Sequence, residues 1–259
     1  MSLTGHQVVE SCNIMGNTGR ILTIDARITP EEILALAASA WSDQPDAPAV
    51  AEKIVGEMNR IIRPEALFQW FDLEKVLDGE IMITEPVSGT SARLTTGGFS
   101  PYFHRATRFL AALYTLGPKV DTLLHRLTTK DREMEAHFVN MGSLAALTRT
   151  ASVLTRLAEN RAKQEGVGVS PPLSPGSIEG WELHSQRELC ALFPMDAIGI
   201  TQGDDAILSP MNTLSVVIAI GPGFTDAKAG SPCRLCRMGG SCTLTCSNHK
   251  ATLTQRAAG

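Results

Sequence analysis

The sequence has no apolar run long enough to cross a membrane. Its longest mainly apolar segment, Leu214–Ile220, has the length of a strand, whereas a membrane-spanning helix needs about 20 residues. The first residues, MSLTGHQVVESCNIMGN, also lack the basic start and apolar centre of a signal peptide. We therefore expect a cytoplasmic protein without a membrane anchor.

Positive charge is in slight deficit, with 23 Lys and Arg against 27 Asp and Glu. This balance argues against a general affinity for nucleic acid. Acidic residues are absent after Asp226, although basic residues continue to the end: Lys228, Arg234, Arg237, Lys250 and Arg256. Such local positive charge could steer an acidic partner, or it could offset the charge of metal-bound thiolates.

Cysteine is scarce outside this same region. Of six cysteines, only Cys12 and Cys190 lie elsewhere, and each is expected to be a small buried apolar residue. The other four are spaced C-x2-C-x5-C-x3-C: Cys233, Cys236, Cys242 and Cys246. A disulfide framework would spread its cysteines along the chain, and the cytoplasm keeps thiols reduced.

Four clustered thiolates can complete a tetrahedral zinc shell or hold a [4Fe–4S] cluster. The spacing therefore predicts a metal site at these four cysteines, with the iron–sulfur cluster favoured and zinc as the alternative. A reduced tail that binds no metal is also left open.

The first hundred residues predict both strands and helices. Thr29 can cap a helix that has Pro30 in its first turn, and Glu32 completes a capping box. The segments expected here are a strand hairpin at 6–14 and 20–25, helices from residue 30 and over 49–62, and a strand at 80–84.

Residues 101–165 are expected to be mostly helical. One helix begins at Ser100-Pro101 and carries Phe109 to Leu116, a second begins at Pro118, and the stretch 131–164 forms one long helix or two joined near Gly142. The four glycines and three prolines of 166–180 exclude a helix, and residues 170–180 within it are either a ligand loop or a linker. A helix over Trp181–Phe193 and a strand over Leu214–Gly221 follow.

Several motifs, in their order and spacing, resemble a known family. They are GVSPPLSPGS (168–177), GWELHSQRELCALF (180–193) and GITQGDDAILSPMNTLSVVIAI (199–220), with VSGTSARLTTGG (87–98) and AALYTLGPKVDTLLHRL (111–127) upstream. They resemble the activation-domain superfamily of cobalamin-dependent methionine synthase, and most of all its stand-alone relatives beside corrinoid methyltransferase systems. The resemblance covers roughly residues 85–225.

The resemblance implies an α+β fold, a mixed sheet with packed helices, followed by the cysteine-rich metal-binding segment. We expect an N-terminal α/β part at 1–100, a helical block and activation-domain-like core at 101–225, and the cysteine-rich segment at 226–259. In that family the domain binds S-adenosylmethionine (SAM) and closes over a corrinoid domain whose cobalt has become Co(II).

The family's SAM site maps onto two places in this chain. They are the turn Ser174, Pro175, Gly176 and Ser177, and the acidic residue Asp204. Ser177 stands where the family has tyrosine, and no arginine occurs between Arg161 and Arg187, so the carboxylate clamp is missing and SAM binding is in doubt. Asp204 could instead be a solvated turn residue.

The resemblance and the cysteines together suggest an accessory protein of corrinoid metabolism. It would dock on a corrinoid-binding protein or methyltransferase and support reductive activation of the cobalt through its C-terminal cluster. The alternatives are a non-catalytic subunit of a corrinoid methyltransferase complex with structural zinc, and a SAM-dependent methyl-transfer enzyme with a rebuilt site. A homo-oligomer is left open.

Overall fold

The computed structural model describes residues 13–14 and 19–238. The chain divides into two compact units, and each is described by itself. The first comprises Met1–Phe68, Ala112–Leu154 and Phe193–Leu214; the second comprises Gln69–Ala111, Thr155–Leu192 and Ser215–Gly259. Among the described helices, none is both long and apolar enough to span a membrane.

Eight strands form the main sheet, in the order β1-β2-β3-β6-β10-β7, with β4 pairing to β3 and β5 to β4. These strands are β1 (Asn13–Ile14), β2 (Arg20–Thr23), β3 (Glu65–Leu77), β4 (Gly79–Thr84), β5 (Ser91–Gly97), β6 (Arg108–Thr115), β7 (Gly168–Val169) and β10 (Thr213–Gly221). A separate hairpin pairs β8 (Thr201–Gln202) with β9 (Leu208–Ser209).

The main sheet is antiparallel, where the sequence predicted a mixed one. Every strand pair with a defined register among the described residues is antiparallel. The connection between β3 and β4 is one example of a turn that fixes this direction, because Asp78 alone separates the two strands. Such a tight turn can only reverse the chain, whereas a parallel pair needs a long crossover.

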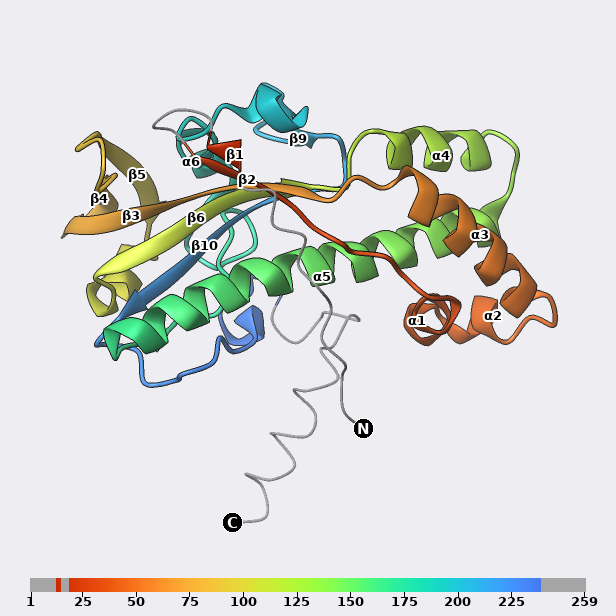
Figure 1. Ribbon diagram of the computed structural model, residues 1–259, viewed down its shortest axis with the longest axis horizontal. Coiled ribbons are helices and arrows are strands. Elements are labelled where there is room, and N and C mark those ends of the chain that lie inside the picture. The colour runs from red at the N-terminus through yellow and green to blue at the C-terminus, as the bar shows by residue number, and fades with distance from the viewer. Residues whose placement is uncertain (1–12, 15–18, 239–259) are drawn as a thin grey trace, which may run out of the picture. The chain divides into compact units, whose positions relative to one another are not determined.

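Helices dominate the first unit, where α3 packs against α1, α2 and α4 (Figure 1). Their bounds are α1 (Pro30–Leu36), α2 (Ser39–Ser42), α3 (Ala47–Ile61) and α4 (Lys119–Thr128), and the long α5 (Glu133–Glu165) begins here. The predicted capping box of α1 is confirmed: Thr29 Oγ1 accepts from Glu32 N at 3.4 Å, and Glu32 Oε2 accepts from Thr29 N at 2.8 Å.

The glycine inside α5 is a packing residue. The helix is continuous over 33 residues, so of the two predicted alternatives the single long helix is the one observed. A Cβ on Gly142 would lie 2.7 Å from Met58 Sδ and 2.8 Å from Ile28 Cδ1. Glycine here lets the helix backbone approach these two side chains, at the cost of some helix propensity.

Two predicted helices are wrong. Residues 100–116 form a short 3-10 helix, η2 (Ser100–Arg105), and then strand β6, whose residues Phe109–Thr115 are all buried. A strand buried on both faces has the same uninterrupted apolar pattern as a buried helix, so periodicity could not separate them. The helix predicted over Trp181–Phe193 is reduced to η3 (Leu183–Ser185) and α6 (Gln186–Cys190), and η4 (Met195–Ile198) follows.

An aromatic cluster forms the core of the second unit. Trp181 is 1% exposed and stacks on Phe99, with ring centroids 6.1 Å apart, while it meets Phe103 edge to face at 5.8 Å. Its Nε1 donates to Thr95 O of β5 at 3.0 Å. The tryptophan is therefore a core anchor whose one polar atom is satisfied.

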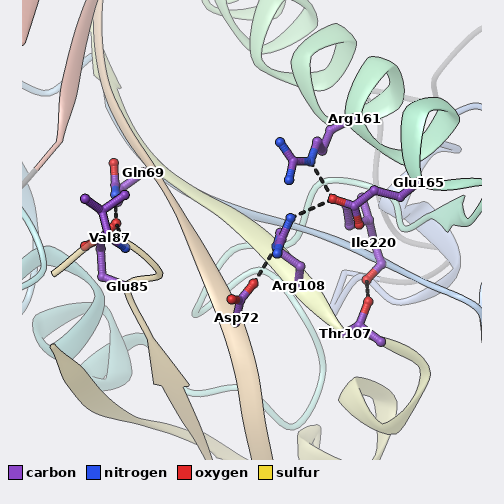
Figure 2. Close-up of polar contacts among 9 residues, drawn as sticks. All are labelled: Gln69, Asp72, Glu85, Val87, Thr107, Arg108, Arg161, Glu165 and Ile220. Atoms are coloured by element: carbon purple, nitrogen blue, oxygen red, sulfur yellow. Dashed lines mark hydrogen bonds and ion pairs between the residues drawn. The ribbon is translucent and has the colours of Figure 1, made fainter. Parts of the chain in front are cut away.

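A charged network joins β3, β6 and the end of α5 within the second unit (Figure 2). Arg108 Nε lies 2.5 Å from Asp72 Oδ1, and its Nη1 lies 2.6 Å from Glu165 Oε1. Glu165 also accepts from Arg161 Nε at 2.5 Å. The hydrogen bond that Arg108 donates to Asp72 is the main reason that the pKa of Arg108 is raised, so the guanidinium stays charged between its two acids.

The carboxylate of Glu85 organises the loop between β4 and β5. The residue is 4% exposed and accepts from Gln69 Nε2 at 2.6 Å and from Val87 N at 3.1 Å (Figure 2). It also accepts from Ser88 N. Burial alone would raise the pKa of Glu85, but these hydrogen bonds outweigh it and the pKa is lowered. The loop is therefore held by an ionised acid.

This lowered pKa predicts a pH dependence of stability. A carboxylate with a lower pKa in the folded state adds stability above its unfolded pKa, and that contribution is lost as the pH falls through the folded pKa. We expect Glu85→Gln to be less stable than wild type at pH 7, and the gap in the free energy of unfolding to close below about pH 4. Urea unfolding at stepped pH measures the gap; two curves that stay parallel would contradict the prediction.

Gly168 in β7 offers a test of backbone packing in the second unit. A Cβ at this position would lie 2.1 Å from Phe224 O, a backbone atom that cannot move alone, whereas one at Gly98 would meet nothing within 4 Å. We expect Gly168→Ala to lower the free energy of unfolding by about 1–3 kcal/mol. Gly98→Ala is the matched control and should stay close to wild type in the same denaturation experiment.

Candidate functional site

The first two cysteines of the predicted metal site lie on a short turn near the end of the described chain. Ser231 caps the 3-10 helix η5 (Pro232–Arg234), and its Oγ accepts from Cys233 N at 3.3 Å. Cys233 and Cys236 are both partly exposed, and Cys233 Sγ accepts a hydrogen bond from Ser231 Oγ at 3.0 Å.

The residues after this turn pair with another part of the second unit through an isolated β-bridge, and we call them the docked segment (Leu235–Arg237). Leu235 O accepts from Glu179 N at 3.0 Å, and Arg237 N donates to Ser177 O at 2.9 Å. Between these two hydrogen bonds, Cys236 forms an isolated antiparallel bridge with Ile178. A predicted metal ligand is therefore fixed by its backbone to another part of the same unit.

The surface that receives the docked segment is the predicted ligand loop. We call residues 174–182 the Pro-Gly loop. An ion pair at 2.6 Å between Arg237 Nη2 and Glu182 Oε1 adds to the backbone contacts. Sequence reasoning did not find this contact, although Glu179 and Glu182 were a signal: they give the loop a negative charge opposite a C-terminal region that has no acid after Asp226.

The turn of this loop satisfies its own backbone. Gly176 N donates to Trp181 O at 2.8 Å, while Ser177 N and Ile178 N both donate to Ser174 O, at 3.2 and 3.3 Å. These bonds use the three successive N–H groups that a ligand held by the turn would need. The backbone of residues 176–178 therefore has no donor left for a bound molecule.

Most side chains of this turn are also hydrogen-bonded or buried. Ser174 Oγ donates to Ser215 O of β10 at 2.7 Å, and Pro175 is buried and has no N–H. Gly176 has φ +80°, and a Cβ there would lie 3.1 Å from Leu183 Cβ, so the position requires glycine. Only Ser177 is exposed. The residues present do not fit a SAM molecule held by this turn.

Asp204, the acidic residue assigned to the same site, belongs to the first unit. It is exposed in the turn between β8 and β9. Beside it, Asp205 Oδ1 accepts from Ile207 N at 3.0 Å, as expected for an acidic turn residue. Its assignment to a ligand site stays a prediction.

Only two of the four predicted metal-binding cysteines, Cys233 and Cys236, lie in the described residues. Cys242 and Cys246 lie outside the described residues, as does Cys12, and residues 19–238 contain no group of three or more His, Cys, Asp or Glu that could hold a metal. Cys190 is 1% exposed, and burial raises the pKa of its thiol to about 12. It is therefore a buried apolar residue, as predicted, and is unsuited to ligation, which requires a thiolate.

Comparison with known proteins identifies the fold. No family model matches the chain, and no curated protein matches it. Among solved structures, the chain resembles the crystal structure of the MetH reactivation domain bound to AdoHcy, with a TM-score of 0.51 and 13% identity over 79% of this chain and 78% of that one. The chain shares this fold. The α+β architecture that the sequence motifs implied is confirmed, while its placement among the stand-alone relatives stays a prediction.

The occupied donors of the Pro-Gly turn predict that it does not take SAM. We expect no binding heat when the protein is titrated calorimetrically with SAM to about 1 mM, where even a weak complex of about −4 kcal/mol would be detected. S-adenosylhomocysteine should behave in the same way. A saturable heat signal with either compound would contradict the prediction.

Proposed function

We propose that this protein supports the activation of a cobalamin-dependent enzyme or corrinoid protein, and that its C-terminal cysteines hold a [4Fe–4S] cluster for that purpose. The shared fold with the MetH reactivation domain supports the link to cobalamin chemistry. The observation that supports the redox part is the position of Cys233 and Cys236, two partly exposed cysteines on a turn that is bonded to the rest of the second unit.

The chemistry of cobalt activation gives a reason for such a site. When the cobalt of a corrinoid protein has been oxidised to Co(II), the cobalt needs one electron at low potential before it can be methylated again. A [4Fe–4S] cluster on four thiolates would supply single electrons of this kind when reduced by a low-potential donor. The corrinoid itself would be carried by the partner protein.

The described residues contribute placement and charge. The docked segment fixes the backbone of Cys236, and the exposed Arg234 and Arg237 flank the two thiols. Lys228, 2.8 Å from Glu159 Oε2, begins the same basic stretch. These cations would offset the negative charge of thiolates around a cluster and would attract an acidic surface of the partner.

Anaerobic reconstitution with iron and sulfide tests the redox part. We expect wild type to bind iron and sulfide in equal amounts and to show sulfur-to-iron charge-transfer absorption that bleaches with dithionite. Cys236→Ser should lose most of this absorption, because a serine hydroxyl is a poor ligand for iron in a cluster. Cys190→Ala is the matched control, since its buried thiol lies outside the cysteine-rich segment, and it should keep the wild-type spectrum.

A colourless wild-type protein that contains zinc would contradict the redox role. It would favour the second candidate, a non-catalytic subunit of a corrinoid methyltransferase complex with a structural zinc site. That candidate is supported by the Cys-x2-Cys turn, which is half of many zinc sites, and by its attachment to the folded unit. Chelation would then lower the stability of the protein without removing any redox signal.

The third candidate is a SAM-dependent methyl-transfer enzyme. The committed donors of residues 174–178 argue against it, and the calorimetric titration described above decides it.

A further inference from the structure

The turn that carries Cys233 and Cys236 brings the two residues within the range of a disulfide. Arg234 ends the 3-10 helix η5, and Leu235 follows it with φ −108° and ψ −4°. These conformations are close to those of the two central residues of a type I turn, whose first and last Cα atoms lie less than about 7 Å apart. A disulfide needs Cα atoms about 4.4–6.8 Å apart, so the backbone of this turn can accommodate one without a large rearrangement.

Both sulfur atoms are accessible, and one of them is supported by a donor. Cys233 and Cys236 are partly exposed, whereas Cys190 is 1% exposed. Cys233 Sγ accepts a hydrogen bond from Ser231 Oγ at 3.0 Å, and the exposed Arg234 follows directly in the sequence. A donor hydroxyl and a nearby cation both stabilise the negative charge of a thiolate, which is the form that attacks a disulfide.

We propose that Cys233 and Cys236 are a reversible redox pair that exchanges with a small-molecule disulfide. Cys233 is the attacking residue, because the hydroxyl of Ser231 supports its thiolate. Cys236 is the resolving residue, because its bridge to Ile178 fixes its backbone beside the attacking residue. The proposal needs no metal and does not rest on the proposed function.

The exchange takes two steps that balance. The Cys233 thiolate attacks one sulfur of the substrate, so that a mixed disulfide forms, the S–S bond of the substrate breaks, and the first thiolate leaves with the electron pair and takes up a proton. The Cys236 thiolate then attacks Cys233 Sγ, which closes the disulfide between the two cysteines and releases the second thiol. The pair loses two electrons and two protons, and the substrate gains them to become two thiols.

The position of this pair favours a labile disulfide over a structural one. A disulfide between residues 233 and 236 closes a very short loop, and the stabilisation that a disulfide provides grows with the length of its loop. Partly exposed disulfides are also open to attack by thiols, which makes them easier to reduce. Such a pair stays reduced in a reducing compartment and is oxidised only transiently.

Peptide mapping of the full-length protein tests the pair. The reduced protein, kept in a chelator so that no metal occupies its thiols, is equilibrated with mixtures of reduced and oxidised glutathione, alkylated and digested with trypsin. Cleavage after Arg234 separates the two cysteines, so their disulfide joins the peptides 229–234 and 235–237. We expect this linked pair to rise with the fraction of oxidised glutathione and to disappear on reduction. No linked pair, or linkage mainly to the peptide 238–250, would overturn the proposal.

Single variants test the roles of the two cysteines. With oxidised glutathione, Cys236→Ser should accumulate a stable mixed disulfide on the peptide 229–234, because no resolving thiol is left. Cys233→Ser should form its mixed disulfide on 235–237 at least about five-fold more slowly, because the supported thiolate is the more reactive one. Equal rates at the two positions would overturn the assignment of the attacking residue.

Ser231 is a positioning residue, and its hydroxyl is tested in the Cys236→Ser background. Ser231→Ala should slow the formation of the mixed disulfide at Cys233 at least about three-fold, because one hydrogen bond to the sulfur is lost, and Ser231→Thr should keep the rate. Ser177→Ala is the matched control, since it removes an exposed hydroxyl from the loop that the docked segment contacts. Equal rates in the two alanine variants would contradict the role of Ser231.

The results separate this proposal from the proposed function. If the linked peptides appear but no iron–sulfur cluster assembles on reconstitution, the cluster is excluded and the redox pair stands. If a cluster assembles but the linked peptides never appear, the proposed function stands and the redox pair is overturned.

Discussion

The second unit depends on how the backbone of residues 166–182 finds its hydrogen-bond partners. This stretch contains too many prolines and glycines to form a helix, yet much of it is buried, and a buried backbone group without a partner is costly. The partners come from elsewhere. Ser170 N donates to Ala219 O at 2.8 Å, and Leu173 exchanges two bonds of 2.8 Å with Val217. The indole Nε1 of Trp181 donates to Thr95 O of β5, and Glu179 N donates to Leu235 O of the docked segment.

This constraint explains why a familiar fold can carry an altered site. At 13% identity, the likeness to the MetH reactivation domain establishes the arrangement of the chain and nothing about its ligands. A loop that uses its own donors to close a turn, and its remaining backbone groups to bond Leu235 and Arg237, keeps the fold while its N–H groups are already taken. The sequence departures at Ser177 and between Arg161 and Arg187 agree with this, because they remove two side chains that the family resemblance assigns to the SAM site.

Sequence reasoning succeeded where the deciding contacts are local. The capping box of α1 needs only residues 29–32, and the strand at 213–221 is set by its own β-branched residues. It failed for β6, because Phe109–Leu116 is buried on every side and therefore shows no period. It also missed β3 and β5, where polar and charged residues break the apolar pattern. The motif resemblance singled out the turn at residues 174–177, but residue types alone do not show that the N–H groups of residues 176–178 are already bonded.

The docked segment was beyond prediction because its partners are about sixty residues away in the sequence, and only the pattern of charge hinted at the contact. This long separation in the sequence is also why the contact matters for the predicted metal site. Without this contact, the predicted metal ligands Cys233 and Cys236 would have no fixed place relative to the rest of the second unit. With Leu235 and Arg237 bonded to residues 177–182, any metal on these thiols is held at a defined place on the second unit. Electron transfer to a partner requires such a place, because its rate depends steeply on the distance between donor and acceptor.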